Sequence, residues 1–171
     1  FSATTYYKYY VRAICSGCTN SAWIGPYSFA TTSPGLSCNA PIQVASLPYS
    51  TTDSTANYSD NPTIEGSPGT SCGITGNYLN GNDVVYSYTA PANGTISVTM
   101  TPTGNNSGIF AYSSCANIGV TCLNGAAGTT ATVRTFNLPV TAGETYYFVI
   151  SSLNTTQTIG YTLVIQTVNC A

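Results

Sequence analysis

The sequence predicts an all-β protein built around an antiparallel β-sandwich. Short runs rich in β-branched and aromatic residues are separated by clusters of Gly, Pro and Asn, as expected of strands and tight turns. No 11-residue window repeats its apolar residues at helical spacing. With 171 residues the chain can bury a sizeable core. About eight short strands with frequent turns favour a sandwich over a fold that contains helices.

The clearest pattern is a β-hairpin. Residues 84–88 and 95–100 are rich in β-branched and aromatic side chains, and the turn between them contains Asn93 and Gly94. In the second run apolar residues alternate with Thr and Ser, which is typical of a sheet covered on one side. We therefore expect three residues of this run to face a core: Ile96, Val98 and Met100.

Further strands are predicted before and after this hairpin. The full set of predicted strands in the main domain is 42–47, 83–89, 95–101, 108–112, 131–138, 144–151 and 160–166. The segment 49–81 carries closely spaced Asn, Pro and Gly residues. It is expected to be a loop with one or two short edge strands.

Residues 1–33 form a separate part of the chain in this prediction. Residues 5–13 alternate as a strand, and the run from Trp23 to Thr31, WIGPYSFAT in one-letter code, suits a closing strand. Together they resemble the last two strands of a fibronectin type III module. Two strands alone do not make a stable sheet. The remaining strands are therefore expected upstream of this sequence or from another chain.

Domain boundaries follow from composition. A Ser-, Pro- and Gly-containing linker at 32–37 ends the partial module 1–33. The main domain is placed at 34–168. Residues 169–171, Asn-Cys-Ala, contain the same three residue types as Cys38-Asn39-Ala40 after the linker, in another order. They are therefore expected to start a following linker or module.

Charged residues are scarce. Three Lys and Arg and five Asp and Glu make up 5% of the chain, against about a quarter in an average domain, and the net charge is -2. Such a chain has no basic patch for nucleic acid or for an anionic membrane surface. An apolar run near 18 residues is also absent from the sequence. Neither nucleic acid nor membrane insertion is therefore expected.

Seven cysteines without any His indicate disulfides formed in an oxidising compartment, not metal sites or catalytic thiols. The predicted location is extracellular or at the cell surface. Cys15 and Cys18 form a Cys-x-x-Cys motif in a predicted hairpin loop. A local disulfide, or bonds to absent partners, is expected there, because no second ligand pair for zinc accompanies the motif.

Disulfide pairing is predicted from spacing in the sequence. Cys115 and Cys122 flank a short connection, and a bond between them would contribute about 2–3 kcal/mol on the chain-entropy estimate. Cys38 with Cys72 would pin the irregular segment to the first strand. Cys38 with Cys170 is the alternative, since it would join the two ends of the domain.

Four motifs in order carry a second resemblance: NDVVYSYTAPANG at 82–94, IFAYSSC at 109–115, AGETYYFV at 142–149 and GYTLVI at 160–165. They are similar to successive strands of the bacterial pre-peptidase C-terminal (PPC) domain family. The first resembles its signature Asp-Val-Trp-Tyr-x-Phe-x-Ala-Pro-x-x-Gly, with Val85 at the Trp position. The resemblance implies a jelly-roll-like, non-catalytic sandwich attached to secreted peptidases or large surface proteins. Its pairing with a fibronectin-type module resembles secreted proteins of Bacteroidetes.

Acidic and amide side chains in the predicted loops offer the hard oxygen ligands that calcium prefers. Some PPC domains bind calcium near their first strands, so the resemblance implies calcium as the one cofactor to consider. The candidate ligands are Asp53, Asp60, Asn82 and Asp83. The alternative is that these residues only form turns.

Three tyrosines of the irregular segment are candidates for a glycan-binding platform, because an aromatic ring stacks on a sugar face. They are Tyr49, Tyr58 and Tyr78. The alternative is that they occupy core or sheet-edge positions.

Catalysis is not expected. A Ser nucleophile would lack its usual His base, and the single lysine, Lys8, lies in the partial module. Asp83 begins a predicted strand and Glu144 follows a Gly turn, which are structural positions for acidic residues.

Taken together, the sequence predicts a non-catalytic structural and adhesive module of a large secreted or cell-surface bacterial protein. One alternative is an accessory domain of a secreted peptidase or polysaccharide-degrading enzyme that binds substrate or assists export. Another is a repeat unit of an extracellular filament completed by strand exchange. The expected partners are neighbouring modules of the same polypeptide, a glycan or cell-surface ligand, and copies of the chain itself.

Overall fold

The computed structural model describes residues 6–61 and 64–168. The chain divides into two units, 1–33 and 34–171, and each is considered by itself. The predicted start of a following module at 169–171 lies outside the described residues, as does Cys170.

The first unit is a two-stranded antiparallel hairpin of β1 (Tyr6–Val11) and β2 (Ile24–Ala30). Its register sets Tyr7 opposite Phe29 and Tyr9 opposite Tyr27, so four aromatic rings share one face. The ring centroids of each pair lie 5.4 Å apart. The predicted local disulfide is confirmed, because Cys15 and Cys18 are bonded in the loop between the strands.

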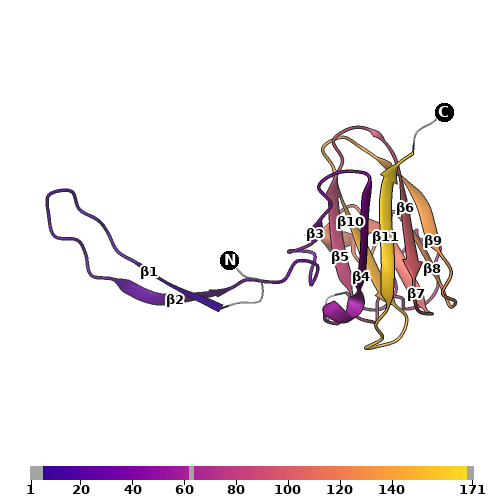
Figure 1. Cartoon of the computed structure of the whole chain (residues 1–171), viewed down its shortest axis with the longest axis horizontal. Helices are drawn as coiled ribbons and strands as arrows, with labels where there is room; N and C mark the ends of the chain where they lie inside the picture. The colour runs from indigo at the N-terminus through magenta and orange to yellow at the C-terminus, as the bar shows by residue number, and fades with distance from the viewer. Residues whose placement is uncertain (1–5, 62–63, 169–171) are drawn as a thin grey trace. The chain divides into compact units, whose positions relative to one another are not determined.

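The second unit is a β-sandwich, as predicted (Figure 1). The described residues contain these strands: β3 (Ile42–Gln43), β4 (Tyr49–Ser54), β5 (Val84–Thr89), β6 (Gly94–Pro102), β7 (Ser107–Tyr112), β8 (Asn124–Gly128), β9 (Arg134–Val140), β10 (Thr145–Ser152) and β11 (Gly160–Thr167). Two short 3₁₀ turns, η1 (Thr55–Asn57) and η2 (Cys115–Asn117), follow β4 and β7. No helix among the described residues is long and apolar enough to cross a membrane.

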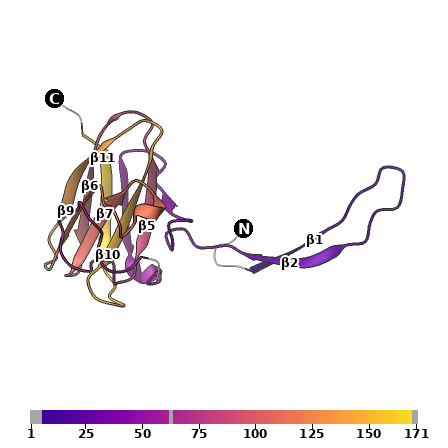
Figure 2. The same ribbon diagram turned by 180° about the vertical axis from the view of Figure 1, so that it is seen from behind.

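The strand order is that of a jelly roll. One sheet has the order β3-β5-β10-β7-β8 and the other β4-β11-β6-β9, and Figure 2 shows the sandwich from behind. The antiparallel partners nest: β4 pairs with β11, β5 with β10, β6 with β9 and β7 with β8. This nesting is what rolling up one long hairpin produces, and it confirms the jelly-roll-like architecture. β3 adds to β5 in the parallel direction.

The main core lies between the two sheets and is built from alternate residues of each strand. On β6 the inward residues are those expected from the sequence, Ile96, Val98 and Met100, each at most 1% exposed. Facing residues from β5, β7 and β10 complete the cluster. The two predicted strands and the inward face of the second are therefore confirmed, but their predicted pairing as a hairpin is wrong. β5 lies in the five-stranded sheet and β6 in the four-stranded sheet, so the connection at Asn93 crosses from one sheet to the other.

A second apolar cluster covers the outer face of the five-stranded sheet. The strands contribute Val85, Phe110, Tyr112 and Val149 from that face. The irregular segments 64–79 and 118–122 lie over them and supply buried side chains of their own: Ile64, Tyr78, Leu79, Ile118 and Cys122. We call these two segments the cover. Because of the cover, β5 and β7 are buried on both faces, which explains their nearly continuous apolar sequences.

Two predicted strands differ from the structure, and one observed strand was not predicted. The first strand is two residues long instead of 42–47, and the strand expected from residue 131 begins at Arg134. β8 was not predicted, because its sequence, NGAAG, is rich in residues that are uncommon in strands. Its glycines are required by close packing. A Cβ at Gly125 would lie 2.7 Å from the Phe110 ring, and one at Gly128 would lie 3.2 Å from the Arg134 guanidinium.

Candidate functional site

One disulfide of the second unit joins the two segments of the cover to each other, and a second lies next to the cover. The four predicted cysteines are all bonded, but the predicted pairing is wrong: Cys38 is bonded to Cys115, and Cys72 to Cys122. The bond of Cys38 to Cys115 also leaves no role for the alternative pairing with Cys170.

The reason lies in a short bridge between the two segments of the cover. Thr70 donates its N–H to the carbonyl of Val120 at 2.9 Å, and Cys122 donates its N–H to the carbonyl of Thr70 at 2.9 Å. This places residues 70–72 alongside 120–122, so Cys72 faces Cys122. Spacing along the chain could not reveal a pairing that depends on this tertiary contact.

Asp83 is the centre of the most unusual polar site. It directly precedes β5, its side chain is 0% exposed, and its Oδ2 accepts a hydrogen bond from the Asn61 N–H at 3.3 Å. The pKa of Asp83 is raised to about 8. Burial is the largest cause; hydrogen bonds from Ser151 and Asn61 oppose it, and the nearby carboxylates of Asp60 and Glu65 add to it. A buried carboxyl group with such a pKa is a candidate functional group.

Two carboxylate oxygens at this site lack a hydrogen-bond partner. Oδ1 of Asp83 and Oδ1 of Asp60 are both buried and unpaired in the described structure. Buried polar atoms are normally satisfied, so an unpaired pair of oxygens fits a position where a cation would bind. Hard oxygen atoms of this kind are the ligands that calcium takes.

The other two predicted calcium ligands have different partners. Asp53 accepts hydrogen bonds from the Ser54 N–H at 2.7 Å, the Asn57 amide at 2.6 Å and the Tyr58 hydroxyl at 2.7 Å. Asn82 donates its side-chain amide to the carbonyl of Tyr58 at 2.6 Å. Of the four candidates, the structure therefore brings together Asp60 and Asp83, while Asp53 and Asn82 hold the segment around η1 in place.

Within residues 6–61 and 64–168, no group of three or more His, Cys, Asp or Glu side chains gathers closely enough to hold a metal ion. Asp60 and Asp83 would thus have to be completed by carbonyl and hydroxyl oxygens, which calcium accepts.

The three candidate tyrosines do not form an exposed platform. Tyr78 is 6% exposed and packs in the cover. Tyr49 and Tyr58 are half-buried against the main core, where Tyr49 contacts the ring of Tyr86 with centroids 6.2 Å apart. Burial and the bonded Asp53 carboxylate raise the pKa of Tyr58. The expected exposed platform is therefore not formed by this trio, because their rings fill apolar volume that the sequence pattern did not reveal, and glycan binding stays a prediction.

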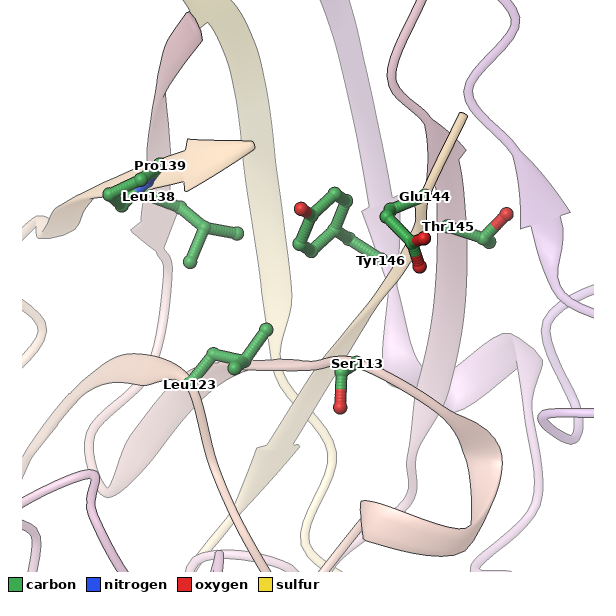
Figure 3. Close-up of a pocket in the computed structure, with 7 residues that line it drawn as sticks. All are labelled: Ser113, Leu123, Leu138, Pro139, Glu144, Thr145 and Tyr146. Carbon is green, nitrogen blue, oxygen red and sulfur yellow. The ribbon is translucent and has the colours of Figure 1, made fainter. Parts of the chain in front are cut away.

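A pocket that the sequence did not reveal opens where β9 turns into β10 (Figure 3). It has a volume of about 340 Å³. The lining residues are Ser113, Leu123, Leu138, Pro139, Glu144, Thr145 and Tyr146. In Figure 3, Leu123 and Leu138 point toward the Tyr146 ring, and the Glu144 carboxylate lies on the opposite side of the pocket. An apolar pocket with one acidic group at its rim has the composition of a small ligand site.

Comparison with known protein families and with curated proteins finds no match for this chain.

Proposed function

We propose that this chain is a non-catalytic structural and adhesive module of a large secreted or cell-surface bacterial protein. The observation that carries the proposal is the cover, which buries the outer face of the five-stranded sheet and whose two segments are joined by Cys72–Cys122, while Cys38–Cys115 crosslinks the chain beside it. A fold stabilised by two apolar clusters and disulfides suits an oxidising environment outside the cell. Its resemblance to PPC domains and fibronectin type III modules supports the same role.

The outer face of the four-stranded sheet supports the adhesive part of the proposal. Its outward residues are uncharged, and neighbouring strands pair their hydroxyls: Thr52 with Thr162, and Thr99 with Thr135, each at 3.0 Å. Such a surface stays hydrated without charge. It therefore repels neither acidic nor basic partners.

The proposal is tested on the purified 171-residue chain in two assays. Immobilised chain should retain bacterial cells or their extracted surface glycans, and it should turn over no substrate in panels of peptides, esters and glycosides. Turnover that survives repurification would overturn the non-catalytic assignment. Failure to retain any cell or glycan would remove the adhesive part.

A second candidate function is calcium binding by Asp60 and Asp83. It is favoured by the two buried oxygens without hydrogen-bond partners, and by the cost of burying a charged Asp83 without a counter-ion. A bound calcium ion would supply the opposite charge at this point and fasten residues 59–61 to the start of β5.

Calorimetry with calcium and with a chelator tests this assignment. Calcium at 100 times its dissociation constant should stabilise the wild type by about 2.7 kcal/mol. Asp83→Asn should lose that response, whereas Asp53→Asn, which removes a carboxylate engaged elsewhere, should keep it. An unchanged wild-type melting temperature in millimolar calcium would exclude the site.

A further inference from the structure

We propose that the pocket of Figure 3 binds the side chain of a lysine or arginine from a partner polypeptide, with Glu144 as the counter-ion. The inference deepens the adhesive part of the proposed function and rests on it, since the basic side chain comes from another molecule. It names the chemistry that the partner must present.

The walls of the pocket suit the stem of a basic side chain. Leu138 and Tyr146 are 3% and 7% exposed and form the inner wall, while Leu123, which is 42% exposed, forms the outer one. Lysine and arginine bury their methylene stems along such apolar surfaces and keep the charged group at the rim. A volume of about 340 Å³ lies at the lower end of the range for ligand sites, which suits a single side chain.

The charge at the rim has no partner in the described structure. No hydrogen bond or ion pair to the Glu144 carboxylate exists among the described residues, although its backbone is bonded on both sides. A carboxylate beside an apolar pocket attracts a cation that enters the pocket.

The second unit offers no cation of its own to Glu144. Of the three basic residues of the chain, Lys8 and Arg12 precede residue 34, and Arg134 is the one that remains. The Arg134 side chain is 5% exposed and donates to backbone carbonyls, among them those of Ser107 at 3.2 Å and Gly128 at 2.8 Å. Glu144 is exposed, and any side chain that pairs with its carboxylate therefore comes from outside this unit.

The backbone holds Glu144 in a fixed position. Glu144 donates its N–H to the carbonyl of Thr141 at 3.1 Å and accepts the N–H of Ala90 at 3.0 Å. Gly143, with φ of 83°, adopts the left-handed conformation that closes this turn. Asn93 accepts the N–H of Ala142 at 2.8 Å and ties the same turn to the β5–β6 connection. A carboxylate on such a braced turn loses little backbone freedom when it binds.

The test is an NMR titration of the complete 171-residue chain with blocked pentapeptides that differ only at the central residue. Lysine, arginine, norleucine and glutamate serve as the central residue in four Gly-rich peptides. The lysine and arginine peptides should shift the methyl signals of Leu123 and Leu138, with affinities above that of norleucine and falling as salt is raised. The glutamate peptide should not bind.

Two variants and a matched control locate the site. Glu144→Gln should lower the affinity for the lysine peptide by up to about five-fold, as for a partly exposed ion pair, and leave the affinity for the norleucine peptide unchanged. Leu123→Ala should lower the affinity for both peptides. Glu65→Gln, which removes an exposed carboxylate away from the pocket, should change neither affinity.

Three results would overturn the inference: equal affinity for lysine and norleucine, unchanged lysine binding by Glu144→Gln, or shifts that map away from Leu123 and Leu138. A negative titration on chain that still retains cells or glycans would remove this pocket and leave the adhesive proposal standing. A chain that neither binds peptides nor retains cells would remove both.

Discussion

The hydroxyl groups of Tyr86 and Tyr161 lie 2.7 Å apart inside the sandwich. Tyr86 belongs to β5 and Tyr161 to β11, so their hydrogen bond joins the two sheets across the main core. Both side chains are 1% exposed, and burial raises the pKa of each hydroxyl. Each hydroxyl thus provides the hydrogen-bond partner of the other in a region that water does not reach.

Removing one of these hydroxyls should cost more than removing both. Tyr161→Phe leaves the Tyr86 hydroxyl buried without this partner, and we expect a loss of about 1–3 kcal/mol in the free energy of unfolding. The double variant with Tyr86→Phe should recover part of that loss, because neither polar group then remains. Denaturant unfolding of the wild type, both single variants and the double variant gives the coupling energy. Additive losses would show that the hydrogen bond does not couple the sheets.

The cover should depend on the disulfide between its two segments. Replacing Cys72 and Cys122 by Ser removes a bond with a sequence separation of 50, and the chain-entropy estimate for such a loop is about 4 kcal/mol. We expect earlier protease cleavage within 64–79 and increased binding of a hydrophobic dye as Phe110 and Val149 become accessible. Replacing Cys15 and Cys18 in the hairpin is the matched control. Equal protease resistance of the wild type and the Cys72/Cys122 variant would contradict the assigned role of the bond.

Arg134 should act as a structural residue. Its guanidinium donates to the carbonyls of Ser107, Gly128, Thr130 and Thr132, so it closes the connection between β8 and β9. Arg134→Met keeps an apolar stem but leaves these carbonyls without their donor, and we expect a loss of about 3 kcal/mol or more in the free energy of unfolding. Arg12→Met, which removes a cation over the Trp23 ring in the hairpin, is the control. A loss below about 1 kcal/mol would mean that water replaces the guanidinium.

Stability should fall as pH rises through the range that Asp83 controls. Its pKa is raised to about 8 in the folded chain from an ordinary value of 3.8, so its favourable contribution is complete below about pH 4. It is then lost progressively up to about pH 8, with a slope of at most about 1.4 kcal/mol per pH unit. Asp83→Asn should flatten this part of the profile in denaturant unfolding at fixed pH values without calcium. Parallel profiles for wild type and variant would show that Asp83 ionises normally.

The sequence predicts the sandwich well because strand patterns are local. The alternation of Ile96, Val98 and Met100 against Thr and Ser defines an inward face without knowledge of the partner strands. The sequence predicts β8 poorly. Gly125 and Gly128 leave space for the Phe110 ring and the Arg134 guanidinium, and those contacts exist only after folding.

The candidate sites likewise could be predicted where they depend on local sequence and could not where they depend on tertiary contacts. Asp83 could be singled out from its position before a strand, but its pairing with Asp60 depends on how the segment before the cover folds back. Tyr78 was a candidate for an exposed platform, whereas it packs with Ile64 and Leu79 within the cover. The pocket beside Glu144 combines residues from β9, β10 and the end of β7, which no linear motif could bring together.

The bond between Cys38 and Cys115 also determines how the sandwich would respond to mechanical load. Tension that enters the chain before Cys38 passes through this bond directly to Cys115 and bypasses β3 to β7. Only the strands after Cys122 can then be drawn out. β11 resists in shear, because antiparallel partners β4 and β6 hold it on both sides. The oxidised module would extend by a limited length under force, and the reduced one would unravel further.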